Sequence, residues 1–402
     1  MYYLCENVYI VNGAINAAIY DFNNNLLYQV SEKPKELLNK CLSGEKSFTS
    51  FEKKGINNLL EKNIITPNYV PSHNIKDIKK ENETIFFSWI EITTMCNCKC
   101  IHCYEEASIE SGKIMEYKDF CYAIDELQNY GVKKIQLIGG EPCILGNNIL
   151  KYLDYAIGKF DDIAIYSNGT IMTDEMISYF KKNNVRVLLS VYSYNPSWHD
   201  SVTQVIGSHS KTVNTIKKLK LAGIKYRTNN ILMKNICLGN KDTELYNLST
   251  NGDIVRLTGR ANVSLLNPAL MKKKMITRKS FKKPINRELT AKLLKWNRCF
   301  SNRIYIACNL DVYPCVMERR ILHGNLKYKK LEEIIRDDIK MLNKDYIDEC
   351  SECELRYACL ECRPDSLGGK ITAKPWQCTY LPLKGLWQDS EELISSILDN
   401  DN

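Results

Sequence analysis

The residues best able to do chemistry are the 17 cysteines, many of which gather in two places along the 402-residue chain. The first cluster is Cys96, Cys100 and Cys103, spaced C-x3-C-x2-C. Three thiolates on one short loop suit an iron–sulfur cubane, in which one iron then stays open to bind another molecule. A zinc site would want a fourth protein ligand, so it is the weaker interpretation. Cys98 lies inside the loop and is predicted to be a bystander, because C-x-C spacing chelates two corners of one cube poorly.

The second cysteine cluster is denser and lies near the C-terminus. Its members are Cys350-x2-Cys353-x5-Cys359-x2-Cys362 and Cys378, with Cys299, Cys308 and Cys315 upstream. Five residues between the two C-x2-C pairs are too few for a zinc ribbon, which needs about fifteen to twenty. Residues 299–380 consist of short, turn-rich segments with too little apolar material for an independent core. We therefore expect ligated metal to hold this region together.

The composition favours a folded protein of the cytoplasm. Hydrophobic residues make up 44% of the chain and charged residues 25%, which excludes a disordered or collagen-like protein. No apolar run is long enough for a membrane span, and the N-terminus lacks the pattern of a signal peptide. Because the cytosol keeps thiols reduced, metal ligation explains the cysteines better than disulfides do.

The net charge of +8 comes from one segment. Residues 271–287 hold eight basic residues and no acidic one. Apart from Phe281 the segment lacks the interleaved aromatic residues of a nucleic-acid binder, so we expect no nucleic-acid partner. We interpret it as part of a solvated, partly disordered connector, with a docking strip for an acidic partner as the alternative.

The elements that must position the first cysteine cluster alternate between strand and helix. Amphipathic helical stretches, such as one that begins at Tyr117 and stops near Gly131, separate six strand-like runs. These runs are Ile85–Thr93, Lys134–Ile138, Asp162–Ser167, Val185–Val191, Lys225–Leu232 and Asp253–Leu257. Repeated strand-then-helix units predict parallel strands and an α/β fold, a partial (β/α)6 TIM-type barrel with one side open for a large substrate. In such barrels the chemistry lies at the carboxyl ends of the strands.

The first 70 residues form a pattern of their own. Three short strands come first, followed by two helical stretches. The strands are Val8–Val11, Ala17–Phe22 and Leu26–Val30, and the helical stretches surround Leu38 and Ile56. This outline predicts a winged-helix-like module over residues 1–70, joined to the barrel by a polar linker over residues 71–83.

The cysteine motif and the strand ends together resemble the radical S-adenosylmethionine (radical SAM) superfamily. C-x3-C-x2-C is the hallmark of that family, and His102 and Tyr104 beside its last cysteine are a common local form. Gly139-Gly140-Glu141-Pro142 ends the second strand and matches the family's GGEP motif. Ser167-Asn168-Gly169-Thr170 ends the third strand, and Ser190 ends the fourth. One motif at each successive strand end makes the resemblance specific.

This resemblance implies a cofactor site. Cys96, Cys100 and Cys103 would hold a [4Fe–4S] cluster whose open iron binds S-adenosylmethionine, and reduction would cleave that cofactor to a 5′-deoxyadenosyl radical. The implied contacts of S-adenosylmethionine are Tyr104, Gly139, Gly140, Glu141, Asn168 and Ser190. Among these, the carboxylate of Glu141 is suited to accept an ammonium group. No His, Asp or Glu stands out by its spacing as a general base, so the catalytic residue is left unassigned.

The second cysteine cluster resembles the SPASM extension of peptide-modifying radical SAM enzymes, which carries two auxiliary iron–sulfur clusters. It implies one cluster on Cys350, Cys353, Cys359 and Cys378, and another on Cys299, Cys315 and Cys362. Two features depart from the family: two residues rather than three precede the fourth cysteine of the motif, and Leu310 stands where the hairpin usually has glycine. Cys308 either completes the second ligand set, which we favour, or leaves an iron open for a substrate thiol.

Residues 1–70 resemble the recognition element of enzymes that modify ribosomally made peptides. In that family the module binds the precursor's leader as an added strand; an ordinary helical cap on the barrel is the alternative. The chain is thus expected to install a thioether or carbon–carbon crosslink on a precursor peptide, with an external electron donor such as flavodoxin or ferredoxin. Other possibilities are an anaerobic sulfatase-maturating (formylglycine-generating) enzyme and a non-catalytic iron–sulfur or zinc scaffold.

The expected organisation follows the chain in order. A peptide-recognition module and a linker come first, followed by the radical SAM barrel, a basic connector and the SPASM domain. Their expected ranges are 1–70, 71–83, 84–262, 263–298 and 299–390.

Overall fold

The computed structural model describes residues 1–236, 238–365 and 369–399. The chain forms two compact units, each built from separated segments. The N-terminal unit comprises Met1–Glu83, Met275–Arg298 and residues 341–399, and the barrel unit comprises Thr84–Lys274 and Cys299–Lys340. These units differ from the expected consecutive ranges, because residues 299–340 of the Cys-rich region belong to the barrel unit and the rest to the N-terminal unit.

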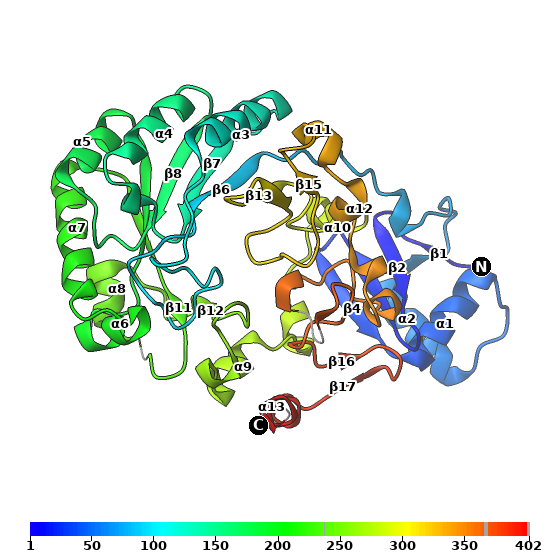
Figure 1. The fold of residues 1–402 in the computed structure, drawn as a ribbon. Helices are drawn as coiled ribbons and strands as arrows, with labels where there is room; N and C mark the ends of the chain where they lie inside the picture. The colour runs from blue at the N-terminus through cyan, green and yellow to red at the C-terminus, as the bar shows by residue number, and fades with distance from the viewer. Residues whose placement is uncertain (237, 366–368, 400–402) are drawn as a thin grey trace. The chain divides into compact units, whose positions relative to one another are not determined.

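Five parallel strands form the centre of the barrel unit. In spatial order they are β6 (Phe87–Thr93), β7 (Lys134–Gly139), β8 (Asp162–Ser167), β9 (Arg186–Ser190) and β10 (Tyr226–Asn229). One face of this sheet is covered by helices α3 (Tyr117–Tyr130), α4 (Asn148–Ala156), α5 (Asp174–Lys182) and α7 (Ser208–Ala222) (Figure 1). Buried aliphatic side chains from strands and helices form one core between these layers. The sheet stays open, which confirms the predicted partial α/β barrel.

The sixth strand differs from the prediction. The predicted run Lys225–Leu232 splits into β10 and β11 (Ile231–Leu232), and β12 (Asp253–Ile254) pairs in parallel with β11 only. The split has a local cause, because the side chain of Asn230 accepts from the Ser249 N–H and donates to the Ser249 carbonyl, both at 3.0 Å. These bonds replace a strand ladder at that point.

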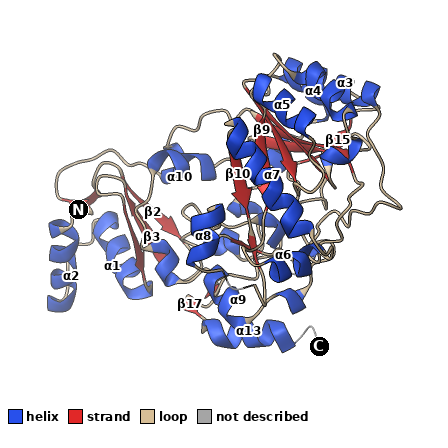
Figure 2. Cartoon of the chain, turned by 90° about the vertical axis from the view of Figure 1, so that its left-hand side faces the viewer, coloured by secondary structure: helices blue, strands red, loops and turns tan. Residues whose placement is uncertain are grey.

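The other edge of the sheet carries strands from far along the chain. Strand β13 (Arg303–Ile306) adds in parallel to β6, and β14 (Asp311–Tyr313) and β15 (Gly324–Asn325) follow it antiparallel. The predicted Cys-rich domain over residues 299–390 includes this hairpin, whereas in the structure the hairpin extends the barrel sheet. Short helices complete this unit: α6 (Pro196–Thr203), α8 (Asn240–Tyr246) and α9 (Pro268–Lys274) (Figure 2), and α11 (Leu331–Ile334) and α12 (Asp337–Lys340) (Figure 1).

The N-terminal unit begins with an antiparallel sheet of β2 (Val8–Asn12), β3 (Ala17–Asp21) and β4 (Leu26–Val30). Both faces of this sheet are covered. Helices α1 (Glu32–Ser43) and α2 (Ser50–Glu61) pack on one face, and residues of segments 275–298 and 341–400 on the other. The remaining elements are β1 (Tyr3–Leu4), β5 (Ile65–Thr66), α10 (Arg287–Leu293), β16 (Tyr380–Leu381), β17 (Leu386–Trp387) and α13 (Ser390–Asp399).

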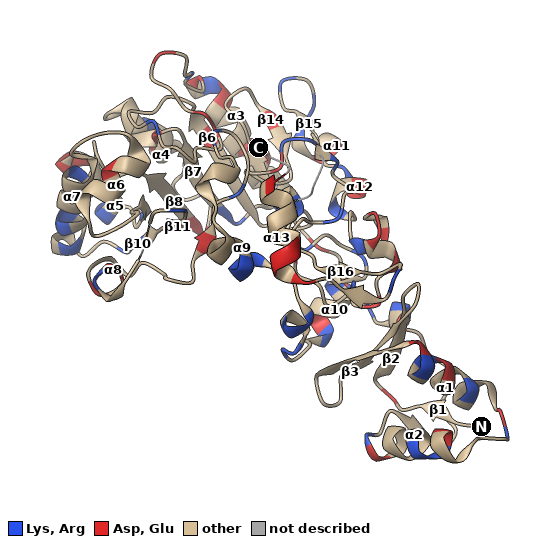
Figure 3. Cartoon of the chain, turned by 90° about the horizontal axis from the view of Figure 1, so that it is seen from below, with Lys and Arg blue, Asp and Glu red and all other residues tan. Residues whose placement is uncertain are grey.

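The basic segment is ordered, which corrects the expectation of a partly disordered connector over residues 263–298. Helix α9 ends with Lys272–Lys274 (Figure 3), while Met271 on the same helix is fully buried. Farther along, Ile285 and Leu294 are buried in the core of the N-terminal unit. Apolar residues between the lysines therefore anchor the segment and leave only its charged side chains in water. Among the described residues, no helix has the length and apolarity needed to cross a membrane.

Candidate active site

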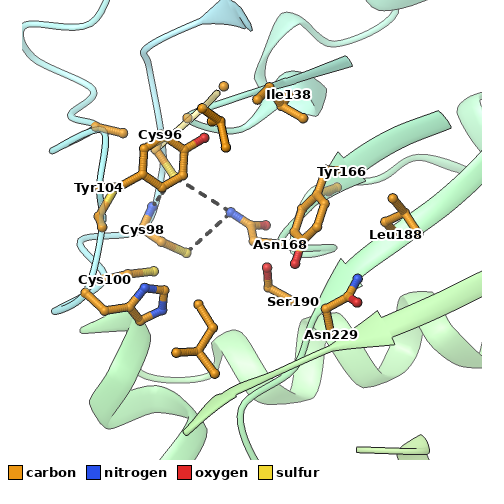
Figure 4. Close-up of a pocket in the computed structure, with 18 of the residues that line it drawn as sticks. Cys96, Cys98, Cys100, Tyr104, Ile138, Tyr166, Asn168, Leu188, Ser190 and Asn229 are labelled. Atoms are coloured by element: carbon orange, nitrogen blue, oxygen red, sulfur yellow. Dashed lines mark hydrogen bonds between the residues drawn. The ribbon is translucent and has the colours of Figure 1, made fainter. Parts of the chain in front are cut away.

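The first cysteine cluster lies in the loop that follows β6. Thr93 fixes the start of this loop, because its hydroxyl donates to the Lys113 carbonyl at 2.8 Å and accepts from the Met95 N–H at 3.0 Å. Cys96, Cys100 and Cys103 line a cavity of about 420 Å³ at the carboxyl ends of the parallel strands (Figure 4). The predicted trio is thus brought to one wall, where the barrel fold places its chemistry.

Gly139 and Gly140 join the end of β7 to the cysteine loop. A Cβ atom at Gly139, whose φ is 147°, would meet the Thr93 carbonyl at 2.0 Å, and one at Gly140 would meet the Met95 carbonyl at 2.1 Å. The Gly140 N–H donates to the Thr93 carbonyl at 2.8 Å. Only glycine permits this approach of two backbones, so the pair sets the position of the cysteine loop.

Glu141 makes its hydrogen bonds within the protein. The residue is fully buried, and it is absent from the wall of the cavity. Its carboxylate accepts from the Cys143 N–H at 2.9 Å, the Ser167 hydroxyl at 2.8 Å and the Asn168 N–H at 2.6 Å. Burial raises the pKa of Glu141, and these hydrogen bonds oppose that rise. Glu141 therefore ties the end of β7 to the end of β8, and its assignment as a contact of the cofactor remains a prediction that these bonds do not favour.

Asn168 points toward the cysteine loop (Figure 4). Its amide nitrogen lies 3.5 Å from Cys98 Sγ and 3.9 Å from Cys96 Sγ, and it donates to Asn97 Oδ1 at 2.9 Å. Amide donors to thiolate sulfur stabilise negative charge on it. Ser190 also lines the cavity, with its hydroxyl near that of Tyr166.

Tyr104 lies beside a buried charge cluster that the residue pattern did not predict. The Arg319 guanidinium lies 5.7 Å from the ring centroid of Tyr104, contacts the Glu105 carboxylate, donates to the Tyr305 hydroxyl at 2.7 Å, and is 3.6 Å from Glu91 Oε1. Burial and the neighbouring Glu91 raise the pKa of Glu105 to about 8. These residues are distant in sequence, so no local spacing could have revealed them.

Arg256 and Arg260, which follow β12, have different surroundings. Arg260 donates to the Ala107 carbonyl at 2.7 Å, and its N–H donates to the Cys103 carbonyl at 3.0 Å. It therefore fixes the far end of the cysteine loop. Arg256 lines the cavity instead.

Cys308 and Cys315 lie at opposite ends of a hairpin. Ile306 pairs with Val312 in the β13–β14 hairpin, Cys308 lies in the turn, and Cys315 follows the opposite end. The Cys308 N–H donates to Glu91 Oε2 at 2.9 Å, which ties the turn to β6. The assignment of Cys308 as a fourth ligand beside Cys315 remains a prediction.

The other cysteines of the second ligand set divide between the units. Cys299 and Cys315 belong to the barrel unit and influence each other electrostatically, and burial raises the pKa of Cys315. Cys362 belongs to the N-terminal unit. The assignment of these three cysteines to one cluster remains a prediction.

A four-cysteine site lies within the N-terminal unit; we use this name for Cys350, Cys353, Cys359 and Cys378. All four line one narrow cavity. Burial raises the pKa of Cys350 to about 11 and that of Cys359 to about 12, and the nearby Lys344 ammonium lowers both. Ligand thiols must lose their protons to bind metal, so this cation assists ligation.

The donor sets at both sites fit iron–sulfur clusters. The three cysteines of the C-x3-C-x2-C motif line the barrel cavity together with Cys98, and four cysteines line the second cavity. Thiolates are the ligands that such clusters require. Within the parts of the chain that the structure describes, no three His, Cys, Asp or Glu side chains converge as ligands of a single metal ion.

Comparisons with known proteins agree with this arrangement. Residues 90–236 match the model of the Radical SAM superfamily. The antilisterial bacteriocin subtilosin biosynthesis protein AlbA of Bacillus subtilis is 37% identical over 139 residues, which are 34% of this chain and 31% of AlbA. GTP 3′,8-cyclase of Petrotoga mobilis is 27% identical over 176 residues, 42% of this chain and 53% of the cyclase. The chain thus spans about a third to a half of the length of these curated relatives.

Solved structures share the fold. SuiB of Streptococcus suis matches with a TM-score of 0.58 at 13% identity, over 94% of this chain and 100% of SuiB. Native anSMEcpe with bound AdoMet matches with a TM-score of 0.55 at 15% identity, over 78% of this chain and 98% of that chain. At these identities the likeness establishes the fold alone.

The family model, the relative AlbA and the shared fold confirm the resemblance found in the cysteine and glycine motifs. Proteins of this family use a [4Fe–4S] cluster and S-adenosylmethionine, and SuiB has been crystallised with S-adenosylmethionine. Residues 90–236 are therefore a radical SAM domain.

Proposed function

We propose that this chain is a maturase that forms a thioether or carbon–carbon crosslink in a ribosomally made precursor peptide. The observation that carries this proposal is the cavity at the carboxyl ends of the barrel strands. Four cysteines line it, the three proposed ligands and Cys98, and the other lining residues are mainly apolar and aromatic. Its volume of about 420 Å³ lies within the range of sites that bind small molecules or single side chains.

Cys96, Cys100 and Cys103 would hold the [4Fe–4S] cluster, and Gly140 and Ser190 would contact S-adenosylmethionine. When bound, these groups supply an electron and a carbon-centred oxidant strong enough to remove hydrogen from an unactivated C–H bond. The task of the chain is to position the target carbon and exclude other hydrogen donors. Apolar side chains of the cavity serve that exclusion: Trp89, Ile138, Leu188, Val316 and Met317.

The N-terminal unit would bind the leader of the precursor. SuiB has been crystallised with its precursor peptide SuiA, which supports a peptide as the substrate of this fold. Strand β4 ends its sheet, and within the described residues no strand pairs with its outer edge. An added peptide strand would supply partners for that edge through main-chain hydrogen bonds.

The four-cysteine site would hold an auxiliary iron–sulfur cluster. A crosslink removes two hydrogen atoms from the peptide, one of which leaves as a proton and an electron. A site that holds a one-electron group within the enzyme would suit that chemistry. The reducing equivalents for the barrel cluster would come from an external donor such as flavodoxin or ferredoxin.

The direct test is anaerobic incubation of the reconstituted enzyme with dithionite, S-adenosylmethionine and synthetic precursor peptides encoded beside its gene. We expect 5′-deoxyadenosine, and a peptide product lighter by a pair of hydrogen atoms. A variant with Cys96, Cys100 and Cys103 all changed to alanine is the control and should form neither.

GTP should be tested in parallel, because GTP 3′,8-cyclases are among the relatives. Turnover of GTP without any change in a peptide would contradict a peptide maturase. Absence of 5′-deoxyadenosine from the fully loaded enzyme would favour a non-catalytic scaffold instead.

A further inference from the structure

The cavity of the four-cysteine site is lined by cations as well as thiols. Lys344, Arg356 and Lys374 reach its wall, and no carboxylate of the described residues does. Four thiolates around a metal cluster carry considerable negative charge, so cations at this wall have a direct electrostatic effect on it. Their burial and their ion pairs decide which of them matters most.

Lys344 is the most deeply buried of these cations. Its side chain is 7% exposed, and its ammonium lies 2.8 Å from Glu361 Oε1, whose own side chain is 5% exposed. Arg356 and Lys374 are paired with Asp345 and Glu349, carboxylates with side chains 29% and 41% exposed. Water screens the exposed pairs, whereas the field of the buried pair persists in the low dielectric of the interior.

Glu361 is held by a second cation. Arg363 Nη2 is 3.5 Å from Glu361 Oε2 and donates to the Ala373 carbonyl at 2.8 Å. The carboxylate therefore retains a partner if Lys344 is replaced. This matters for experiment, because removing one member of an isolated buried pair would leave a costly unpaired charge.

We propose that Lys344 and Glu361 set the reduction potential of the cluster at the four-cysteine site, in opposite directions. The proposal rests on the ligand assignment under the proposed function. Reduction adds one electron to the cluster and no proton to Lys344, which remains an ammonium throughout. The positive charge on the cavity wall favours the more negative, reduced cluster, and the carboxylate behind it weakens that preference. Lys344 thus acts electrostatically on the cluster and is not a catalytic residue.

The test is a potentiometric titration of the reconstituted full-length enzyme with dithionite and redox mediators. Electron paramagnetic resonance measures the fraction of reduced cluster at each potential. For Lys344→Met we expect the ratio of reduced to oxidised cluster at a fixed potential to fall about tenfold, a midpoint about 59 mV more negative for a one-electron couple. Glu361→Gln should make the midpoint potential more positive, and the midpoint potential of Lys344→Arg should stay near that of the parent.

Lys292→Met is the matched control. Lys292 also belongs to the N-terminal unit and forms a 2.8 Å ion pair with Glu83, but it does not line the cavity. The variant Lys292→Met should leave the midpoint potential unchanged. A purely structural role for Lys344 would alter the free energy of unfolding without moving the midpoint, so the potential separates the two roles.

The signal must first be assigned with Cys350→Ala. If that variant retains the signal, the ligand assignment is wrong and the proposal falls with it. If the signal disappears as expected, the ligand assignment stands. Equal midpoint potentials for the parent, Lys344→Met and Glu361→Gln would then overturn only the proposed role of the ion pair. Should Lys344→Met fail to hold iron, the Glu361→Gln midpoint decides: an upward shift supports the proposal, and no shift overturns it.

Discussion

Cys98 is the residue that tests the cluster assignment most directly. It is only 2% exposed and lines the same cavity as the three proposed ligands, with the Asn168 amide 3.5 Å from its sulfur. Hydrogen bonding with the Cys100 and Cys96 thiols, together with burial, raises the pKa of Cys98 and favours its protonated form, and C-x-C spacing disfavours it as a ligand. We expect Cys98→Ala to keep the iron content of the parent, whereas the matched change Cys100→Ala should lose the iron of one cluster. The reverse pattern, measured on reconstituted protein, would exchange their roles.

His323 should make the stability of the protein depend on pH. Its Nδ1 accepts from the Arg336 N–H at 3.1 Å, and burial, with a contribution from Arg336, lowers its pKa to about 4. A histidine that is neutral in the folded state and titrates near 6.5 when unfolded stabilises the fold above that pH, and this contribution is lost as the pH falls toward 4. From the pKa shift, the loss is about 3 kcal/mol.

The variant His323→Asn can keep an acceptor for the Arg336 N–H but does not titrate. Urea unfolding of the parent and the variant should therefore show that the parent loses more stability between about pH 7 and about pH 4. Parallel losses in the two proteins would show that His323 does not contribute.

Residue spacing predicted which groups meet at the site where those groups are close in sequence or follow successive strands. The cysteine trio and the paired glycines were predicted to meet at the strand ends, and the structure brings them together. The partners of Glu141 and Arg319 were not predicted, because those contacts join residues on different strands and loops. The GGEP motif does not show whether its carboxylate contacts a bound ligand or accepts hydrogen bonds from the protein itself.

At the scale of elements, the β13–β14 hairpin contains a residue under backbone strain. Leu310 has a φ of 71°, a left-handed conformation that costs a non-glycine residue about 1–2 kcal/mol, yet its side chain is 1% exposed in the core. Truncating a buried leucine costs about 2–5 kcal/mol. The burial therefore outweighs the strain, which explains why leucine is accommodated at this φ.

The strain predicts an inverted order of variants. Both Leu310→Ala and Leu310→Gly should be destabilised, but the glycine variant should be more stable than the alanine variant by about 1 kcal/mol, because only glycine adopts this φ freely. At ordinary positions glycine is the less stable of the two. Thermal unfolding would measure the order, and a more stable alanine variant would contradict the strain.

Strand β4 should gain protection when the precursor binds. Its outer backbone groups have no strand partner among the described residues, whereas β3 is paired on both sides. Added main-chain hydrogen bonds would slow amide exchange in Leu26–Val30 and leave Ala17–Asp21 almost unchanged. Hydrogen exchange with mass spectrometry, with and without peptide, would show this. Protection confined to other segments would argue against docking at this edge.

Element identity was predictable where local patterns were strong. The run Asp162–Ser167 was predicted with its observed bounds, and the helix from Tyr117 ends before Gly131, whose φ is 91°. The two failures lie at sheet edges. Asn230 breaks a strand through bonds to Ser249, and β13 joins β6 across more than two hundred residues of chain. Such pairings depend on tertiary partners that periodicity does not contain.

At the scale of the whole molecule, three separated segments of the chain build one core in the N-terminal unit. Tyr9, Tyr20, Leu294 and Tyr357 belong to one buried cluster, although they come from three separated segments. Linear domain prediction assigns such segments to consecutive modules, because linkers and composition are local signals. The long-range packing that unites them appears only in the fold.

This shared core predicts that residues 1–70 are not a removable module. Their loss would expose Leu294 and Tyr357 and would remove the Tyr20 hydroxyl that donates to the Glu354 carbonyl at 3.2 Å. Because Glu354 follows Cys353 directly, we expect the truncated chain to lose the iron of the four-cysteine site and to unfold at lower urea concentration than the parent. Tyr20→Phe, which keeps the packing, should retain the iron and lose about 1 kcal/mol. A truncated chain that kept the parent's iron and cooperative unfolding would show that the four-cysteine region folds without the N-terminal sheet.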